Sequence, residues 1–319
     1  MMRAEIVIHA SGNSRIGIGN LSRSFELVKH LAGKLKAVAV LECDKALYSR
    51  FQSANTIRSD DLESSLEVIQ GTRCRVYLSD LIAPDRALHD RLKRMGVETI
   101  MHFNGLASGF DPDVLFVTDN FDYPVSREDT KIYRGFDYYV ISQEVVQQRP
   151  KQLVPLDTVR SILVCFGGAD PAGYTEDFTE QIIDHQHHYS IVLGPAMERS
   201  RKDAIRSIAR ENVQYLDAPR TLSGLLLSHD LLVTLGGVTT YEAMCLGVPA
   251  SAVRWSYLTD VVKSFDRLEM VIDLGEIDQA YQNLLDLDVR QLNEFCSNAY
   301  QMIDGSALQN IERVIRQYL

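Results

Sequence analysis

Residues 5–33 read EIVIHASGNSRIGIGNLSRSFELVKHLAG, and this stretch determines the kind of fold that the chain builds. Residues 5–10 form a short apolar run typical of a buried parallel strand. A glycine-rich loop follows, and then apolar residues recur on one face of a helix: Leu21, Phe25, Val28 and Leu31. Gly33 suits the left-handed position that ends such a helix. A strand, a loop and a helix in this order predict the first unit of a doubly wound α/β sheet.

The same alternation of short apolar runs and amphipathic segments continues along the chain. In the first half it predicts further strands at 36–41, 75–79, 98–102, 114–118 and 138–141. In the second half it predicts strands at 161–165, 190–193, 213–216 and 230–235, with helices at 174–183 and 197–209. Two successive open α/β units are therefore expected, each with a mostly parallel sheet.

A polar stretch with prolines at 150 and 155 separates the two series of strands, because proline suits neither a helix interior nor a central strand. We therefore predict an N-terminal domain at 1–142, a linker at 143–158 and a C-terminal domain at 159–319. The last helix, at 308–318, is expected to pack back on the first domain.

The bulk composition limits the classes of function. The chain has 319 residues, of which 45% are hydrophobic and 24% charged, enough for two domains with real cores. A net charge of -10 and a pI near 5.3 argue against a nucleic-acid partner. The apolar runs are strand-sized and the first residues lack the pattern of a signal peptide, so no integral membrane association and a cytoplasmic location are expected.

The cysteines and histidines do not predict a metal site. Five cysteines without a Cys-x-x-Cys pair suit a reducing compartment and neither a disulfide framework nor a zinc site. The densest histidine cluster, at 185, 187 and 188, lacks carboxylate or cysteine partners at ligand spacing. We therefore expect neither a metal nor any other cofactor.

The first glycine loop, residues 11–20, would join a strand to a helix at the carboxyl edge of its sheet, where open α/β sheets bind ligands. Its glycines allow close backbone approach, and the following helix start suits an anion. Gly12, Gly17 and Gly19 do not fit the dinucleotide fingerprint G-x-G-x-x-G. Glu42 and Asp44 nevertheless leave a Rossmann oxidoreductase open as an alternative.

Two further glycine loops follow strands of the second half. Residues 166–171 (FGGADP) precede a helix whose first turn Pro171 favours. Residues 235–242 (LGGVTTYE) combine two glycines, two threonines at a helix start and a carboxylate one turn later. Backbone amides and hydroxyls of this kind coordinate phosphate, and Glu242 can accept hydrogen bonds from ribose hydroxyls. The alternative is a helix cap with a solvent-facing glutamate.

These loops carry a resemblance to the GT-B nucleotide-sugar enzymes that runs over nearly the whole chain. Within them, the sequence resembles the UDP-sugar hydrolases of pseudaminic acid biosynthesis and related spore-coat polysaccharide proteins. It is similar, more distantly, to the glycosyltransferase that adds N-acetylglucosamine in peptidoglycan synthesis. The matching segments are GIGNLSR at 17–23, ILVCFGGAD at 162–170, VLGP at 192–195, GGVTTYEA at 236–243 and LGVP at 246–249.

The resemblance implies two Rossmann-like domains that face a central cleft, with the nucleotide on the C-terminal one. Glu242 would then contact the ribose and residues 237–240 the diphosphate. The residues expected to bind the nucleotide are Gly168, Gly194, Gly236, Gly237, Val238, Thr239, Thr240 and Glu242. The residues expected at the sugar and phosphates are Gly17, Gly19, Arg15 and Arg23.

One departure from the family bears directly on catalysis. The family's first loop usually reads Gly-x-Gly-His, and that histidine is the expected base, but this chain has Asn20 there. An asparagine can orient a hydroxyl or water but cannot accept a proton near neutral pH. The family's paired aspartates near the end of the fifth strand are also replaced, by residues 102–105 (HFNG). Besides Asn20, the candidate catalytic residues are Asp80, His102 and Asp119, which should lie at the carboxyl edge.

Three functions are consistent with these features. The first is a glycosyltransferase that moves a sugar from a nucleotide donor to an unknown acceptor in surface glycan biosynthesis. The second is a UDP-sugar hydrolase in which Asn20 orients the water. The third is a catalytically silent nucleotide-sugar-binding protein, which the loss of the histidine would also explain.

Overall fold

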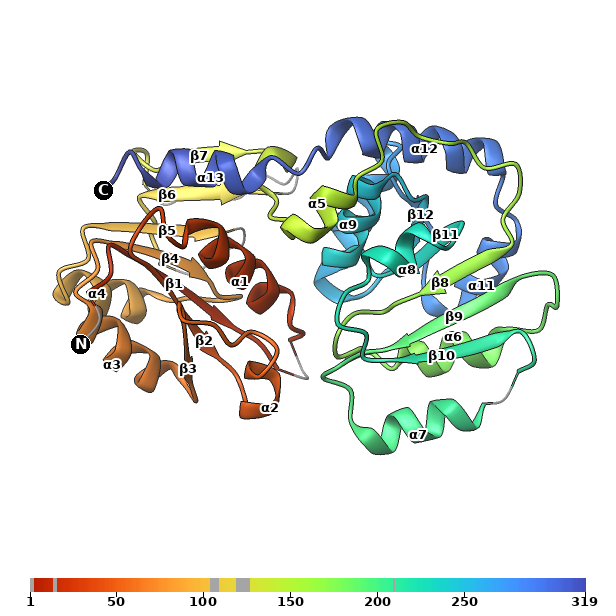
Figure 1. Cartoon of the computed structure of the whole chain (residues 1–319), viewed down its shortest axis with the longest axis horizontal. Coiled ribbons are helices and arrows are strands. Elements are labelled where there is room, and N and C mark those ends of the chain that lie inside the picture. The colour runs from red at the N-terminus through yellow and green to blue at the C-terminus, as the bar shows by residue number, and fades with distance from the viewer. Residues whose placement is uncertain (1–2, 14–15, 104–108, 119–126, 209) are drawn as a thin grey trace. The chain divides into compact units, whose positions relative to one another are not determined.

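The computed structural model describes residues 3–13, 16–103, 109–118, 127–208 and 210–319. The chain forms two compact units (Figure 1). The first contains the N-terminal residues through Asn13, Ile18–Val140 and Gly305–Leu319, and the second contains residues 16–17 of the first glycine loop and Ile141–Asp304. The first unit is thus built from segments that lie at both ends of the chain.

The first unit contains a parallel sheet of seven strands among its described residues, in the order β3-β2-β1-β4-β5-β6-β7. The strands are β1 (Ile6–Ser11), β2 (Ala37–Glu42), β3 (Thr56–Ser59), β4 (Val76–Asp80), β5 (Thr99–Phe103), β6 (Val114–Val117) and β7 (Lys131–Arg134). The helices are α1 (Gly19–Leu31), α2 (Lys45–Tyr48), α3 (Leu62–Thr72), α4 (Arg86–Arg94), the 3-10 helix η1 (Phe136–Tyr138) and α13 (Ala307–Ile315). The order reverses at β1, which pairs with β2 on one side and β4 on the other.

Alternating side chains of the strands bury their two faces under helices. On one face, Val7 and Tyr77 share a core cluster with Leu66 of α3 and with Leu88 and Leu92 of α4. α1 packs on β1 and β2 and in turn contacts α13, which also packs on η1. With both faces covered, the strands read as continuous apolar runs, as parallel strands generally do.

The second unit repeats this plan with six parallel strands among its described residues, in the order β10-β9-β8-β11-β12-β13. The strands are β8 (Ser161–Val164), β9 (His188–Leu193), β10 (Val213–Asp217), β11 (Leu231–Thr234), β12 (Ala250–Ala252) and β13 (Ile272–Asp273). The helices are α5 (Gln143–Gln148), α6 (Tyr174–Gln181), α7 (Arg199–Ser207), α8 (Ser223–Leu227), α9 (Val238–Leu246), η2 (Ser256–Leu258), α10 (Thr259–Arg267), α11 (Ile277–Leu285) and α12 (Val289–Met302). The order reverses at β8, between β9 and β11.

The predicted class of two doubly wound α/β units is confirmed, but the strand predicted at 138–141 is wrong. Tyr138 ends the 3-10 helix η1, and the last strand of the sheet is β7, at Lys131–Arg134. Among the described residues β7 pairs with β6 alone, and three of its four residues are exposed, so its sequence lacks an apolar run. Residues 139–141 are apolar because they are buried, without being part of a strand.

The segment expected to be a linker begins with a helix, α5, which the hydroxyl of Ser142 caps at Val145 N. Arg149 then fastens the chain to the second unit, because its guanidinium donates to the carbonyls of Cys245 and Ile303, both at 2.6 Å. The sequence prediction missed this helix because its six residues carry little apolar periodicity.

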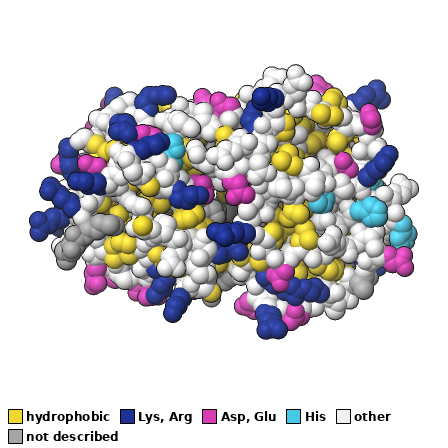
Figure 2. All heavy atoms as spheres, in the orientation of Figure 1, with side chains coloured by type: hydrophobic (Ala, Val, Ile, Leu, Met, Phe, Trp, Pro, Cys, Tyr) yellow, Lys and Arg dark blue, Asp and Glu magenta, His cyan; other side chains and the backbone are white. Residues whose placement is uncertain are grey.

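Two surface properties bear on partners. No helix in the described part of the chain is long and apolar enough to cross a bilayer. On the face drawn in Figure 2, basic side chains are scattered among acidic and uncharged ones. The absence of a nucleic-acid partner stays a prediction.

Candidate functional site

In the second unit, the strand order reverses between β8 and β11, and open α/β sheets bind ligands outside the carboxyl ends of the strands at such a point. The loop 166–171 begins directly after β8, and the loop at 235–237 begins directly after β11. Topology therefore brings the two predicted glycine loops to the same place at the edge of this sheet.

Gly194, which follows β9, packs directly against the first of these loops. A Cβ atom at position 194 would lie 2.3 Å from the carbonyl oxygen of Gly168 and 2.6 Å from that of Gly167. The loop is also held by the Ala196 amide, which donates to Gly168 O at 2.8 Å. Only glycine permits this approach of two backbones, and the contact fixes the shape of the loop after β8.

The loop after β11 leads into the N-terminus of α9. Gly236 has a φ of +83°, and a Cβ there would lie 2.9 Å from a methyl group of Val262. Gly237 is the N-cap residue of α9, makes no side-chain cap, and a Cβ there would meet nothing within 4 Å. The first turn of α9 thus starts beside open space, with amides and a positive dipole that suit an anion.

The remaining predicted nucleotide contacts lie on α9. Val238 and Thr239 in its first turn are half-buried, and so is Glu242 one turn further on. Thr240 is fully buried, and its hydroxyl oxygen has no hydrogen-bond partner among the described residues. The structure therefore brings the predicted glycines, threonines and glutamate together around one helix start.

Asp170 and Arg201 form an anchor that the sequence prediction missed. Asp170 is buried with a φ of +43°, and its carboxylate accepts from Tyr174 N at 3.0 Å and from Thr175 N at 2.9 Å. Arg201 of α7 donates to the same carboxylate at 2.6 Å and to the backbone carbonyl of Asp170. Asp170 therefore ties the loop after β8 to α6 and α7, and no local pattern reveals its distant partner.

In the first unit, Asp80 is the last residue of β4, beside the reversal between β1 and β4. Its carboxylate forms a two-point ion pair with the guanidinium of Arg23, with Arg23 Nε at 2.9 Å, and also accepts from the hydroxyl of Ser24 at 3.2 Å. Arg23 Nη2 donates to the side-chain oxygen of Asn20 at 3.3 Å. Three predicted site residues, Asn20, Arg23 and Asp80, thus form one hydrogen-bonded cluster.

Three of the other predicted catalytic, sugar and phosphate residues lie among the described residues, and two lie outside them. His102 in β5 is buried, with Nδ1 3.2 Å from the carbonyl oxygen of Ser79 and its ring edge-on to Phe110. Gly17 has a φ of +84°, and Gly19 is the first residue of α1. Arg15 and Asp119 lie outside the described residues.

Glu42, one of the two acidic residues that left a Rossmann oxidoreductase open, is the last residue of β2. Asp44 has a structural role, because its carboxylate caps α2 at Leu47 N, at 2.8 Å. Within the described ranges, no three His, Cys, Asp or Glu side chains are grouped as a metal would require.

Comparisons with known proteins agree with this architecture. No protein-family model matches the chain. The chain is 23% identical over 283 residues to the spore coat polysaccharide biosynthesis protein SpsG of Bacillus subtilis (strain 168), which covers 84% of this chain and 83% of that protein. Among solved structures, it is similar to the S. aureus MnaA–UDP complex, with a TM-score of 0.65, 12% identity and coverage of 100% and 97%. The spinosyn rhamnosyltransferase SpnG also gives a TM-score of 0.65, with 11% identity and coverage of 99% and 100%.

The chain has the GT-B fold. In this GT-B protein the glycine loops and the start of α9 lie at the switch point of one sheet, and Asn20, Arg23 and Asp80 lie at the switch point of the other.

Proposed function

We propose that this protein is a nucleotide-sugar-dependent glycosyltransferase that acts at the anomeric carbon of its donor in glycan biosynthesis. The observation that carries the proposal is the start of α9, where the N-cap residue Gly237 has open space at its Cβ position. The printed names of SpsG and SpnG, which concern polysaccharide biosynthesis and rhamnosyl transfer, support the same class.

The second unit provides what a departing nucleoside diphosphate requires. The α9 amides and the Thr239 hydroxyl would bind the diphosphate, and the positive end of the helix dipole would stabilise the charge that develops as the sugar leaves. Glu242, one turn into α9, would accept hydrogen bonds from the ribose hydroxyls.

In the first unit, the Arg23–Asp80 pair changes the roles expected of these residues. Asp80 could accept a proton only after separating from Arg23, and Arg23 could approach a phosphate only after leaving Asp80. In this proposal the Arg23–Asp80 pair positions the side chain of Asn20, because the side-chain oxygen of Asn20 accepts a hydrogen bond from Arg23. The amide group of Asn20 is then oriented to donate to a substrate hydroxyl.

The test has two steps. First, thermal melting is measured with UDP-, GDP-, CMP- and dTDP-sugars, because a ligand of the folded state raises the melting temperature. Second, nucleotide release from the donor that binds is measured with and without a panel of glycan acceptors. Release that requires an acceptor supports the transferase, and release into water alone at the same rate assigns a hydrolase. Binding of a donor without nucleotide release, with or without acceptors, would reject both the transferase and the hydrolase. The function as a catalytically silent nucleotide-sugar-binding protein would then remain.

A further inference from the structure

A buried histidine lies behind the carboxyl edge of the first sheet. His9 of β1 is fully buried, and its Nδ1 lies 2.8 Å from the hydroxyl of Tyr77 on the adjacent strand β4. Its second ring nitrogen, Nε2, has no hydrogen-bond partner among the described residues. A buried imidazole nitrogen without a partner is costly, so the direction in which it points is informative.

That nitrogen points to Glu42. His9 Nε2 lies 3.8 Å from Glu42 Oε2, and the Glu42 side chain, at the end of β2, is 28% exposed. When the Tyr77 hydroxyl donates to Nδ1, the neutral ring carries its proton on Nε2, on the side of Glu42. Glu42 is thus a carboxylate with an open side at the sheet edge and an N–H donor behind it.

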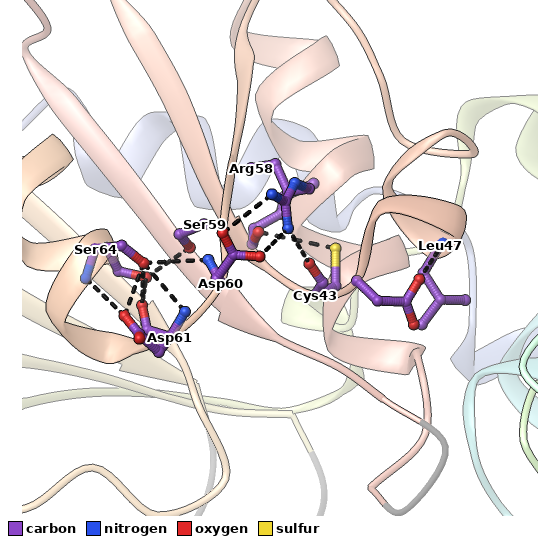
Figure 3. Close-up of polar contacts among 10 residues, drawn as sticks. Cys43, Leu47, Arg58, Ser59, Asp60, Asp61 and Ser64 are labelled. Atoms are coloured by element: carbon purple, nitrogen blue, oxygen red, sulfur yellow. Dashed lines mark hydrogen bonds and ion pairs between the residues drawn. The ribbon is translucent and has the colours of Figure 1, made fainter.

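The other described carboxylates along this edge, from β2 to the start of α4, each have a structural role. Figure 3 shows two of them, in which Asp60 is paired with Arg58 and Asp61 accepts from Ser64. Asp44 and Asp85 cap helices α2 and α4, and Asp80 is paired with Arg23. Glu42 makes no hydrogen bond through its carboxylate to any described residue, and its backbone fixes the loop by accepting from Gly12 N at 3.1 Å.

We propose that Glu42 is the catalytic base, with His9 as its positioning residue, in place of the base that Asn20 cannot be. This inference rests on the proposed function. Glu42 takes the proton from the attacking hydroxyl of the acceptor or of water, and the hydroxyl oxygen forms a bond to the anomeric carbon. The bond from that carbon to the diphosphate breaks, and its electron pair leaves with the nucleoside diphosphate. Glu42 then returns its proton to solvent.

The test measures nucleotide release from the donor, together with the acceptor if one is needed, that gives turnover in the screen above. Glu42→Gln should lower kcat by about 10²–10⁴-fold, the usual contribution of a general base, while the Kd for UDP is unchanged. Asp60→Asn, at the same edge, is the matched control and should keep the wild-type rate. In Glu42→Ala, added formate should restore part of the lost rate, because a small carboxylate can occupy the vacated space.

His9 is tested by a pair of variants. His9→Leu should lower kcat without changing UDP affinity, and His9→Gln, which keeps an N–H donor, should recover most of the rate. Equal rates in Glu42→Gln and wild type would overturn the assignment, and so would a loss in Glu42→Ala that formate leaves unchanged. A wild-type protein that shows no turnover with any donor and acceptor of that screen would overturn the proposed function and this inference with it.

Discussion

The guanidinium of Arg23 donates two hydrogen bonds to the carboxylate of Asp80, although the two residues are 57 positions apart and lie on α1 and β4. Their side chains are only 10% and 2% exposed. The Arg23 guanidinium also lies over the ring of Phe103, 5.2 Å from its centroid. The pair therefore fixes the start of α1, and with it Asn20, relative to the central strands of the sheet.

Removing one partner of this pair should destabilise the first unit. Arg23→Met would leave Asp80 buried and unpaired, and we expect the free energy of unfolding to fall by about 3–5 kcal/mol, as measured in urea. The double variant Arg23→Met with Asp80→Leu should recover most of that loss. A single variant as stable as the wild type would show that the pair is open in solution.

Two glycines should respond differently to alanine. Gly194→Ala would place a Cβ 2.3 Å from Gly168 O, so we expect a loss of about 3 kcal/mol in stability together with weaker nucleotide binding. Gly237→Ala meets nothing within 4 Å and should keep wild-type stability. If the diphosphate binds at α9, the added methyl group should still weaken UDP binding, as measured by calorimetry. Unchanged UDP affinity in Gly237→Ala would show that the diphosphate does not bind at the start of α9.

Glu242→Ala should weaken nucleotide binding without unfolding the protein. A hydrogen bond to a charged group contributes about 1.5–3 kcal/mol, so the Kd of the best nucleotide should rise roughly ten- to a hundredfold. Glu294→Ala, at an exposed position of α12, is the control and should leave the Kd unchanged. Calorimetry measures both, and equal affinities would remove Glu242 from the ribose site.

Asn20→His should create or raise donor hydrolysis, because it returns an imidazole base to the first loop. We expect UDP release into water to increase up to about 10²-fold, and Asn20→Ala should show no such gain. Absence of any increase would mean that the first unit differs from the hydrolases at more than this residue.

Stability should fall in acid through Glu312 of α13. Burial raises the pKa of Glu312, but hydrogen bonds from Lys34, Arg316 and His30 outweigh burial and lower it to about 2 from its ordinary 4.5. Because the folded pKa is the lower one, the stabilisation is complete above pH 4.5 and is lost as the pH falls through about 2. In Glu312→Gln, the urea concentration at the unfolding midpoint should change less with pH over this window than in the wild type. An unchanged slope there would contradict the assignment.

Periodicity predicted the central strands well because buried parallel strands are apolar on both faces. β1, β4 and β11 are such strands, and their buried residues form continuous runs. β3 at Thr56–Ser59 and β7 at Lys131–Arg134 end the first sheet, and each pairs with one strand in the part of the chain that the structure describes. Their polar sequences, TIRS and KIYR, satisfy an edge position but give no periodic signal.

The glycine loops could be located from sequence because a strand, glycines and a helix start are contiguous in the chain. The partners of Asp80, Asp170 and Glu42 could not, because each lies on an element far away in sequence. Glu42 illustrates the difference, since in the sequence it only left a Rossmann oxidoreductase open as an alternative. Only its nearness to a buried imidazole on the neighbouring strand gives it another role.

The return of the last helix to the first unit has a consequence for synthesis on the ribosome. Leu308, Ile311, Val314 and Ile315 of α13 are buried, and α13 packs on α1 and η1, which are made some 170 residues or more earlier. While the second unit emerges and folds, the nascent first unit therefore presents an uncovered apolar face, the kind of surface that chaperones bind. A released chain that ends at residue 304 should therefore carry an aggregation-prone first unit together with a complete second one.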